Sequence, residues 1–425
     1  MPVLASGAMH CLWLSLIDPE PARNGQDLYS SGLIRSVAAA GVRLDVIALA
    51  RSGGAHKDGQ RQDNILWHLV AGERPRWTQS LSMLPRVARR GDTPAMRNAI
   101  RAALASRTYE AVIFDSICAG FALSLCRRTG TGARRPVLLH LAHNHERTAA
   151  TAVAQATHGP FRRVVAGIDA IKVARLERTL VAQCAVTTSN TPEDQTRFES
   201  DSPERPVVLL RPGYDGYRAN ARAIDGHVPR RAIIVGSFDW PPKRKSLEDF
   251  LAAAAGPFAR AGLGLQLVGH GDQEFLASLR SRYPTVDVVG PVNDVSRYLA
   301  GARIALVPDT LGGFKLKSLD YVFHRVPIFS LAGALPGVPL ENGRSVQLFP
   351  DHVALARAVI ASIDDFPLLN RQHEAAYRAC EAEFGWPRIG QQLVAIIREC
   401  VTARARVAET SSSRPQSVAT RAAMR

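Results

Sequence analysis

Short apolar runs alternate with helical periodicity along almost the whole chain, and this alternation restricts the fold more than any other feature. In the first half the runs are CLWLSLI (11–17), RLDVIALA (43–50), AVIF (111–114), PVLLHLA (136–142) and AVTTS (185–189). In the second half they are AIIVGSF (232–238), LGLQLVG (263–269), VDVVG (286–290), RIALVP (303–308) and VPIFSL (326–331). Strands that alternate with helices in this way form parallel sheets with crossover helices. The sequence therefore predicts an α/β protein built from doubly wound sheets.

The chain is too long for one domain core. It has 425 residues, which makes two domains the expectation. A segment rich in Pro, Arg and Gly separates the two series of strands. We expect a first domain over 1–205, a linker over 206–230 and a second domain over 231–385. Residues 401–425 are rich in Ser, Arg and Ala without periodicity, so we expect a disordered tail there.

Composition and cysteine spacing indicate a globular protein of a reducing compartment. Hydrophobic residues make up 46% of the chain and charged residues 21%. The six cysteines form no CxxC pair, which argues against a disulfide framework or a zinc site. The opening residues lack the charged region of a signal peptide. The longest apolar stretch, 111–126, is too short to span a bilayer and contains Asp115. We expect a cytoplasmic protein.

The formal net charge of +15 indicates a polyanionic partner. Positive charge is concentrated in two stretches of the first half, 81–107 and 162–178. The second stretch has Val164, Ile168 and Ile171 at helical spacing, with cations on its other faces. It is either an ordinary surface helix or an interfacial patch for anionic lipid head groups or a lipid-diphosphate acceptor. We favour the patch, and with it peripheral contact at the inner face of the plasma membrane.

The segment GGFKLKSLDYVFHRVPIF (312–329) carries the strongest functional signal. It follows the strand RIALVP, and ligands of doubly wound sheets bind at the carboxyl ends of strands. Gly312 and Gly313 allow a ligand to approach the backbone closely. Lys315 and Lys317 are point charges suited to a diphosphate, and Asp320 can accept hydrogen bonds from ribose hydroxyls. The alternative is a solvated basic turn followed by a helix-start acid.

This segment resembles the donor-site signature of retaining family-4 glycosyltransferases of the GT-B fold, especially the subset with a glycine-rich donor loop. The segments 235–251, 265–279 and 288–309 resemble further blocks of that family in the same order. FGWPRIGQQL (384–393) resembles the closing helix, which we place at 386–400 and which would cross back to the first domain. The resemblance implies two Rossmann-like domains facing across a cleft. The first would bind the acceptor and the second the nucleotide-diphosphate sugar.

The family signature has two glutamates separated by seven residues. Asp320 takes the place of the second, which contacts the nucleotide ribose, and Gly312 takes the place of the first, which contacts the transferred sugar. Lys243 and Lys245 lie where the family places a basic pair, while Ser237 stands where an arginine is often found. The resemblance implies a donor-binding set of Gly25, Lys243, Lys245, Gly312, Gly313, Phe314, Lys315, Lys317 and Asp320.

The first domain supplies the candidate catalytic residues. Asp115 follows the run AVIF, where many relatives have a histidine near the reacting sugar. His143 and Glu146 belong to HNHE at the end of the next run, which resembles a motif of the subset. The resemblance implies transfer with retention, without metal or cofactor, in which a donor phosphate oxygen takes the acceptor proton. The acceptor would be a glycan or a lipid-diphosphate-linked sugar in polysaccharide biosynthesis.

Three other functions stay open at this stage. A sugar-nucleotide epimerase of the same fold would need catalytic carboxylates and histidines that the sequence does not place. A dinucleotide-linked dehydrogenase needs GxGxxG after a strand, and GHGDQE after LQLV is one glycine short. A nucleic-acid-binding protein would explain the charge, but the chain shows no aromatic-basic interleaving. We therefore expect no nucleic acid partner.

Overall fold

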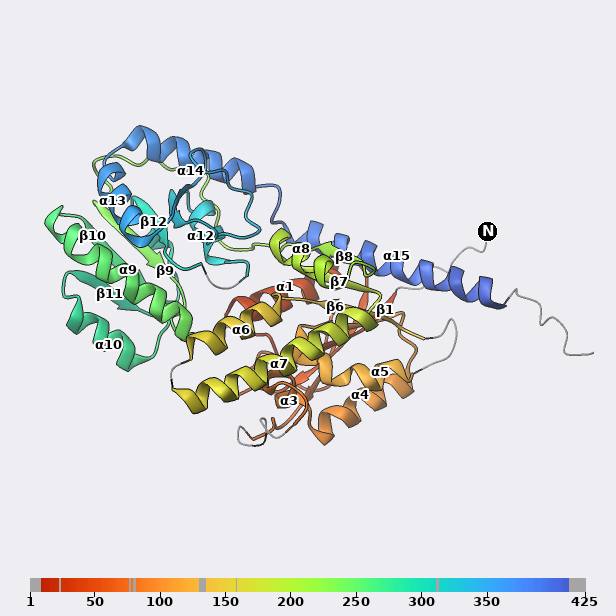
Figure 1. Ribbon diagram of the computed structural model, residues 1–425. Coiled ribbons are helices and arrows are strands. Elements are labelled where there is room, and N and C mark those ends of the chain that lie inside the picture. Colours follow the sequence, from red (N-terminus) through yellow and green to blue (C-terminus); the bar gives the residue numbers. More distant parts are fainter. Residues whose placement is uncertain are drawn as a thin grey trace, which may run out of the picture.

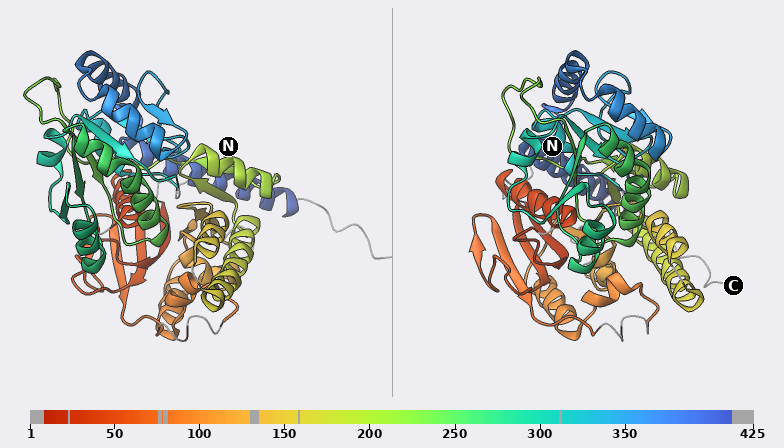
Figure 2. Two further views of the ribbon diagram at one scale, coloured as in Figure 1. Left: turned by 60° about the vertical axis from the view of Figure 1, so that its left-hand side comes forward. Right: turned by 90° about the vertical axis from the view of Figure 1, so that its left-hand side faces the viewer.

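The computed structural model contains two α/β domains, each with a parallel sheet covered by helices (Figure 1). It describes residues 9–22, 24–75, 78, 82–129, 135–157, 159–310 and 313–412. In both views of Figure 2 the second domain, green to blue, lies above the first, red to yellow-green. The predicted α/β class with two doubly wound domains is confirmed.

The first domain has an eight-stranded sheet in the order β3-β4-β2-β1-β5-β6-β7-β8. Its strands pair in parallel, except that β3 runs antiparallel to β4. Strand β1 is central, with Trp13 between Val46 of β2 and Ile113 of β5. Helices on both faces bury the central strands, which explains their continuous apolar sequences. The strands are β1 (His10–Ile17), β2 (Arg43–Leu49), β3 (Arg61–Gln62), β4 (Ile65–Val70), β5 (Ala111–Asp115), β6 (Val137–Leu141), β7 (Val186–Ser189) and β8 (Val207–Leu209).

The helices of the first domain begin at recognisable caps. Asn24 caps α1 by accepting hydrogen bonds from the backbone amides of Gln26 and Asp27, and Thr93 caps α4 in the same way. The helices and the 3-10 turn are α1 (Gly25–Ala39), α3 (Arg86–Gly91), α4 (Pro94–Ser106), η1 (Ile117–Ala122), α5 (Leu123–Arg127), α6 (Glu146–Ala156), α7 (Pro160–Gln183) and α8 (Pro192–Asp201). Helices α6 and α7 form an antiparallel pair beside the cleft (Figure 1).

The second domain has a six-stranded parallel sheet in the order β11-β10-β9-β12-β13-β14. Its strands are β9 (Arg231–Val235), β10 (Gly264–Val268), β11 (Val286–Gly290), β12 (Ile304–Val307), β13 (Ile328–Leu331) and β14 (Gln347–Phe349). Its helices are α9 (Pro241–Arg260), α10 (Gln273–Arg282), α11 (Ser296–Ala300), α12 (Lys317–Phe323), α13 (His352–Ser362) and α14 (Phe366–Cys380). The last helix, α15 (Trp386–Ser412), leaves this domain.

Both sheets have a point where the strand order reverses. In the first sheet it lies between β1 and β5, and in the second between β9 and β12. Helices before and after such a point lie on opposite faces, so the loops leave a crevice at the carboxyl ends of the strands. The two reversal points therefore predict where a shared ligand would bind.

Four strands were absent from the sequence-based prediction, and one of them, β3, has only two residues. Strand β4 pairs in parallel with β2 over six residues although its sequence, ILWHLV, is short and interrupted by a histidine. Strands β8 and β14 each have three residues and lie at sheet edges. Their apolar runs are too short for periodicity to separate them from loops. The remaining predicted strands are observed with boundaries shifted by a few residues.

The segment expected to be a linker, 206–230, is instead largely part of the two domains. It begins with β8, which extends the first sheet, and then packs on the second domain. Ile224 is 1% exposed in the second core, and the backbone amide of Ala219 donates to the carbonyl of Phe323 at 2.8 Å. Its Pro and Arg content reflects a fixed irregular path and not a flexible connection.

Helix α15 crosses back over the first domain, as expected, but continues to Ser412 (Figure 1). The expected start of the disordered tail at residue 401 is therefore wrong for 401–412. Val401 packs against the first domain's core and extends the apolar face made by Leu393 and Ile397. At the crossing, a Cβ on Gly390 would lie 2.5 Å from the carbonyl oxygen of Ser36, so only glycine allows α1 and α15 to approach this closely.

The described cysteines are free, and five of the six are buried. Cys11, Cys126, Cys184 and Cys380 have thiol pKa values raised mainly by burial, as expected for packing residues. In the part of the chain that the structure describes, no helix is both long enough and apolar enough to cross a membrane.

We predict that Ile397→Ala lowers the free energy of unfolding by about 2–5 kcal/mol, because it removes a fully buried side chain from the first domain's core. The adjacent exposed Arg398, changed to Ala, should shift it by no more than about 0.5 kcal/mol. Urea titrations followed by circular dichroism would measure both. An equal, small effect of the two changes would show that α15 does not complete this core.

Candidate functional site

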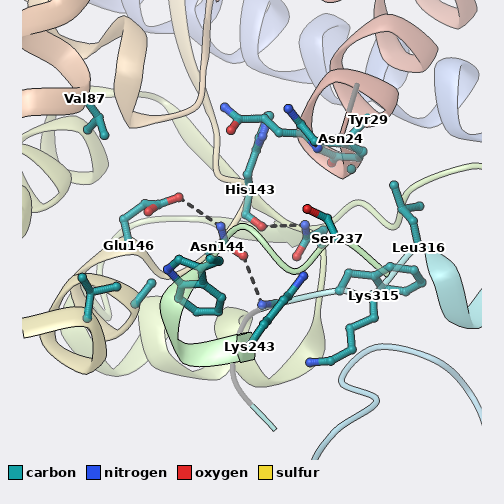
Figure 3. A pocket seen from close by; sticks show the side chains of 18 of the residues that line it. Asn24, Tyr29, Val87, His143, Asn144, Glu146, Ser237, Lys243, Lys315 and Leu316 are labelled. Atoms are coloured by element: carbon teal, nitrogen blue, oxygen red, sulfur yellow. Dashed lines mark hydrogen bonds between the residues drawn. The ribbon is translucent and has the colours of Figure 1, made fainter. Parts of the chain in front are cut away.

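A cavity of about 830 Å³ lies between the two domains at the carboxyl ends of both sheets. From the first domain it is lined by the start of α1, the loop after β6, α3 and the helix pair α6–α7. From the second domain it is lined by the loop after β9, the start of α9, and the segment from Gly313 to α12. Figure 3 shows side chains from both domains directed toward this space. The cavity joins the two points of strand-order reversal, as the topology predicts.

Three lysines surround one aspartate at the second domain's reversal point. Asp309 follows β12, is 4% exposed, and lies 3.3 Å from the Lys315 ammonium and 3.1 Å from that of Lys317. Lys243, in the first turn of α9, lines the same cavity. No ion pair of Lys243 is seen with a described residue. The cluster therefore has more positive than negative charge at the cavity wall.

Burial makes this excess of charge unfavourable without a bound anion. It lowers the pKa of the Lys315 ammonium to about 8, although Asp309 partly offsets the effect. Burial, together with the charge of Lys317, also lowers the pKa of Lys243. Burial opposes ionisation of Asp309, but the three ammonium groups outweigh it and keep its pKa below the ordinary value. A diphosphate would restore the balance of charge, so the cluster is suited to bind one.

Lys245 is not part of this cluster, although the sequence placed it with Lys243. The segment that contains both lysines was expected to be a loop but is the first turn of α9. Side chains two positions apart on an α-helix point in directions about 200° apart. The Lys245 side chain is 66% exposed and pairs with Asp249 at 2.9 Å. It does not line the cavity. The helical geometry thus separates the two lysines.

Asp320 lies on α12 at the cavity wall and is held by a tyrosine from the interdomain segment. The Tyr214 hydroxyl donates to its Oδ1 at 2.9 Å, and the Tyr214 ring stacks on Phe323 with centroids 4.7 Å apart. Burial raises the pKa of the Asp320 carboxyl. With one oxygen oriented by Tyr214, the other can accept hydrogen bonds from a vicinal diol.

The donor-loop glycine Gly313 is where the two domains come closest across the cavity. Its backbone amide donates to Asn144 Oδ1 of the first domain at 3.2 Å. A Cβ at this position would lie 2.4 Å from the same oxygen, so a side chain here would displace the Asn144 amide and disrupt this hydrogen bond. Phe314 lines the cavity and contacts Phe384. Gly312, expected to stand near the transferred sugar, lies outside the described residues.

The start of α1 brings the first domain to the same cavity. Gly25 is the first residue of α1, and both it and the capping residue Asn24 line the cavity. Because Asn24 accepts two backbone hydrogen bonds, it fixes the orientation of this turn. The placement agrees with the expected contact between this turn and the donor.

His143 lines the cavity, and the buried Asp115 holds its ring from the side away from the cavity. Its Nε2 lies 2.7 Å from Asp115 Oδ1, while the same carboxylate accepts hydrogen bonds from Trp13 and Ser30. Burial opposes ionisation of Asp115, but these partners outweigh it and lower its pKa. The carboxylate therefore fixes the hydrogen of His143 on Nε2 and leaves Nδ1 as an acceptor. Nδ1 has no hydrogen-bond partner among the described residues.

Asp115 itself is 2% exposed and does not line the cavity. From the sequence, Asp115 was expected to be a catalytic residue that meets the reactants. In the structure it instead supports His143. Its partners come from β1, α1 and the loop after β6. Trp13, which the sequence indicated only as a packing residue, thus also orients the carboxylate.

Glu146 lines the cavity as the first residue of α6. Burial raises the pKa of its carboxyl, and Asn144 donates to its Oε1 at 3.2 Å. Behind it, Glu177 accepts the backbone amides of Glu146 and Arg147, and burial raises the pKa of Glu177 to about 8. Asn144, His143 and Glu146 therefore form a polar strip opposite the lysine cluster. No group of three or more His, Cys, Asp or Glu side chains that could hold a metal occurs among the described residues.

Sequence reasoning missed four residues of this site. Tyr214 is close to the donor segment only in space, since it follows β8, whereas Asp309 directly precedes that segment in the loop after β12. Asn144 lies inside the HNHE motif but received no role. Trp240 lines the cavity at the start of α9 and was covered by the resemblance of 235–251 without being singled out. The position after a strand end was the available signal for Asp309 and Asn144.

The sequence of residues 229–365 matches the model of a family described as Glycosyl transferases group 1. No curated protein sequence matched the chain. Among solved structures, sucrose-phosphate synthase from Thermosynechococcus elongatus is 19% identical, with 93% of this chain and 100% of that chain covered and a TM-score of 0.72.

Two further structures agree over the same extent. HepE from Anabaena, solved in complex with UDP-glucose, is 16% identical, with 93% of this chain and 100% of that chain covered and a TM-score of 0.61. WaaG, a glycosyltransferase involved in lipopolysaccharide biosynthesis, is 14% identical, with coverages of 91% and 99% and a TM-score of 0.65. The chain therefore has the GT-B fold, and residues 229–365 within its second domain match the glycosyl transferases group 1 model.

We predict that affinity for UDP, used as a probe with a diphosphate group, falls about tenfold between pH 7 and pH 9. Because Lys315 has a pKa of about 8, it carries its charge below this value and is about nine-tenths neutral one unit above it. Titration calorimetry would measure the affinity at each pH. Lys315→Met should bind UDP more weakly at pH 7 and lose the step near pH 8, whereas Lys245→Met should keep it. An unchanged step in Lys315→Met would remove this lysine from the anion site.

Proposed function

We propose that the protein transfers a sugar, with retention at the anomeric carbon, from a nucleotide-diphosphate sugar to an acceptor in polysaccharide biosynthesis. The observation that carries the proposal is the cluster of Lys243, Lys315 and Lys317 around Asp309, with Asp320 beside it in one cavity. The cluster supplies the charge that a diphosphate needs, and Asp320 a carboxylate for ribose. The group 1 domain at 229–365 supports this assignment.

The donor would lie along the second domain's side of the cavity. Ribose hydroxyls would bind the Asp320 oxygen that Tyr214 leaves open, and the diphosphate would bind the lysines. Solved structures of the same fold support a donor of this type, because HepE was solved with UDP-glucose and the pneumococcal GtfA with UDP and GlcNAc. The transferred sugar would then face the polar strip of His143, Asn144 and Glu146.

The reaction needs a group that stabilises charge on the leaving diphosphate. As the bond from the anomeric carbon to the phosphate oxygen breaks, negative charge builds on the diphosphate, and the ammonium groups of the cluster stabilise it. The acceptor oxygen forms the new bond from the same face, and its proton passes to a donor phosphate oxygen. The leaving diphosphate thus acts as the base, and the proposed route requires no metal and no nucleophilic carboxylate.

The polar strip would orient the sugars. His143, with its hydrogen fixed on Nε2 by Asp115, offers Nδ1 as an acceptor for a sugar hydroxyl. Glu146, whose pKa burial raises, can hold a hydroxyl in either protonation state. Both residues would bind sugar hydroxyls, while Asp115 acts through His143.

The main alternative is a sugar-nucleotide epimerase of the same fold. It would use the same lysines but need acid and base groups at the sugar carbon that is inverted. The product distinguishes the two, because a transferase without acceptor hydrolyses its donor slowly and releases the nucleoside diphosphate. A screen of uridine- and guanosine-diphosphate sugars for such release would identify the donor.

We predict that Lys243→Met lowers donor turnover about tenfold to a hundredfold, whereas Lys245→Met leaves it within about twofold. Leaving-group charge peaks in the transition state, so losing a contact of about 1.5–3 kcal/mol acts mainly on turnover. Nucleoside diphosphate release from the best donor of the screen would be the measurement. The two lysines are two positions apart on one helix, so Lys245 controls for charge and for folding.

An equal loss in both variants would show that net charge matters and not the cluster. No loss in Lys243→Met, with the same result for Lys315→Met and Lys317→Met, would contradict the proposed diphosphate site. Formation of an epimerised nucleotide sugar instead of nucleoside diphosphate would establish the alternative.

We also propose peripheral contact with an anionic membrane, through the outer face of α7 and not through 81–107. In the latter segment Arg89 and Arg97 pair with Asp92 and Arg90 pairs with Glu73, so much of its charge is neutralised within the domain. The outer face of α7 instead combines apolar side chains with cations. Its exposed side chains are Phe161, Val164, Ile168, Ile171, Arg175 and Arg178.

We predict that the protein sediments with acidic liposomes at low salt and only weakly with neutral ones. The double change Arg175→Gln and Arg178→Gln should weaken binding about thirtyfold, because each cation near an anionic surface contributes about 1 kcal/mol. Arg260→Gln, an exposed change on α9, should have little effect. Equal binding to neutral and acidic vesicles, or none to either, would exclude this surface.

A further inference from the structure

One end of the cavity has mostly apolar walls, in which Arg86 and Asp169 are the polar residues. It lies between α3, α6 and α7 of the first domain, away from the lysine cluster. We call this end the apolar arm, and its lining residues are Val87, Ala149, Ala150, Val153, Ala166, Ala170 and Val173. The α6–α7 pair that forms most of it packs closely along its length. Small side chains on both helices leave the space open.

The walls of the apolar arm offer a bound molecule few hydrogen bonds. Alanine and valine side chains have no donor or acceptor, and the backbone groups of α6 and α7 are used within the helices. A sugar ring placed here would leave buried hydroxyls unpaired, at a cost of about 1–3 kcal/mol for each. A hydrocarbon would gain about 0.8 kcal/mol for each methylene removed from water. The arm therefore favours a hydrocarbon over a further sugar.

The polar groups nearest to this arm are at its ends. At one end α6 starts with Glu146, next to Asn144 and His143 of the polar strip. Elsewhere on the wall the Arg86 backbone amide donates to Asp169 Oδ1 at 2.9 Å, which joins α3 to α7. A molecule with a hydroxyl-bearing head at the strip would therefore extend its apolar part along the arm (Figure 3).

The arm is continuous with the proposed donor site. One cavity contains both Lys243 and Ala170, and Trp240 of the second domain also lines it. The cavity of about 830 Å³ is in the upper part of the range of small-molecule sites, roughly 300–1,000 Å³. Its lysine-lined part and its apolar part thus offer chemically different places for two substrates.

We propose that the acceptor is an amphiphile whose hydrocarbon chain occupies the apolar arm while its sugar hydroxyl lies at the polar strip. The inference rests on the proposed function and specifies the acceptor as a lipid-linked sugar and not a free glycan. The other explanation for apolar walls is contact with the second domain when the cleft closes. In that case the arm would exclude every acceptor chain.

The direct experiment is a calorimetric binding series of n-alkyl β-D-glucosides, from methyl to octyl, below their micelle concentrations. It is run with and without UDP, so it needs no knowledge of the natural sugar. Affinity should rise about threefold to fourfold for each added methylene, as for burial of the chain. The same affinity for methyl and octyl glucoside would overturn the proposal.

Two substitutions locate the chain. Ala170→Phe fills the arm and should abolish the dependence on chain length. Val153→Thr keeps the shape but adds a hydroxyl to the wall, and should lower octyl glucoside affinity about fivefold to tenfold without affecting methyl glucoside. Ala156→Phe, an exposed change at the end of α6 and outside the arm, is the matched control. Thermal unfolding and UDP affinity show whether each variant is folded.

The outcomes separate this inference from the proposed function. UDP binding without any dependence on chain length leaves the transferase proposal intact and rejects the apolar arm as an acceptor site. Chain-length dependence that persists in Ala170→Phe shows adsorption elsewhere and also rejects it. Chain-length dependence lost in Ala170→Phe but kept in Ala156→Phe supports the arm, even if no UDP binding is found and the donor assignment fails.

Discussion

Three lysine ammonium groups share one buried carboxylate, and the rest of the site depends on this imbalance. Burial opposes ionisation of Asp309, but the charges of Lys317, Lys315 and Lys243 keep its pKa below the ordinary value, while burial lowers the pKa of Lys315 and Lys243. In the ligand-free protein the cluster is therefore held at a cost in free energy. Binding of an anionic ligand would reduce this cost, so the cluster favours anionic ligands over neutral ones.

The two domains line the cavity with residues of different chemical character. The second domain contributes charge, from the loops at the β9–β12 reversal, and the first contributes hydroxyl-binding groups and an apolar wall. Gly313 and Asn144 hold these surfaces together by a hydrogen bond that leaves no room for a Cβ. The GT-B arrangement thus places a charged wall and a weakly polar wall on one cavity, which neither sheet could do alone.

The sequence predicted the two sheets and the donor segment because both depend on local patterns. Lys315, Lys317 and Asp320 follow a buried strand in sequence, and the strand's carboxyl end fixes where they lie. Tyr214 was missed because its role depends on a contact with a distant part of the chain, and Asp309 because its pairing with Lys315 and Lys317 forms only when the loop after β12 folds back. Lys245 was misplaced because the loop expected there is a helix. On a helix the angular position of a residue, and not its nearness in sequence to Lys243, decides whether its side chain faces the cavity. Strand β4 was missed because six residues that include one histidine show too little hydrophobic periodicity to indicate a strand.

The crossing of α15 over α1 also sets an order of events during synthesis. The first domain's core includes Leu393, Val394 and Ile397, which leave the ribosome after every strand of both sheets. Domains generally fold as units in the order in which they are made, but here the domain made first lacks part of its interior until α15 has been made. The second domain, whose core ends at Phe384, is therefore complete before the first. The apolar surface around Leu33 and Val37, which α15 covers in the folded protein, therefore stays uncovered for that interval.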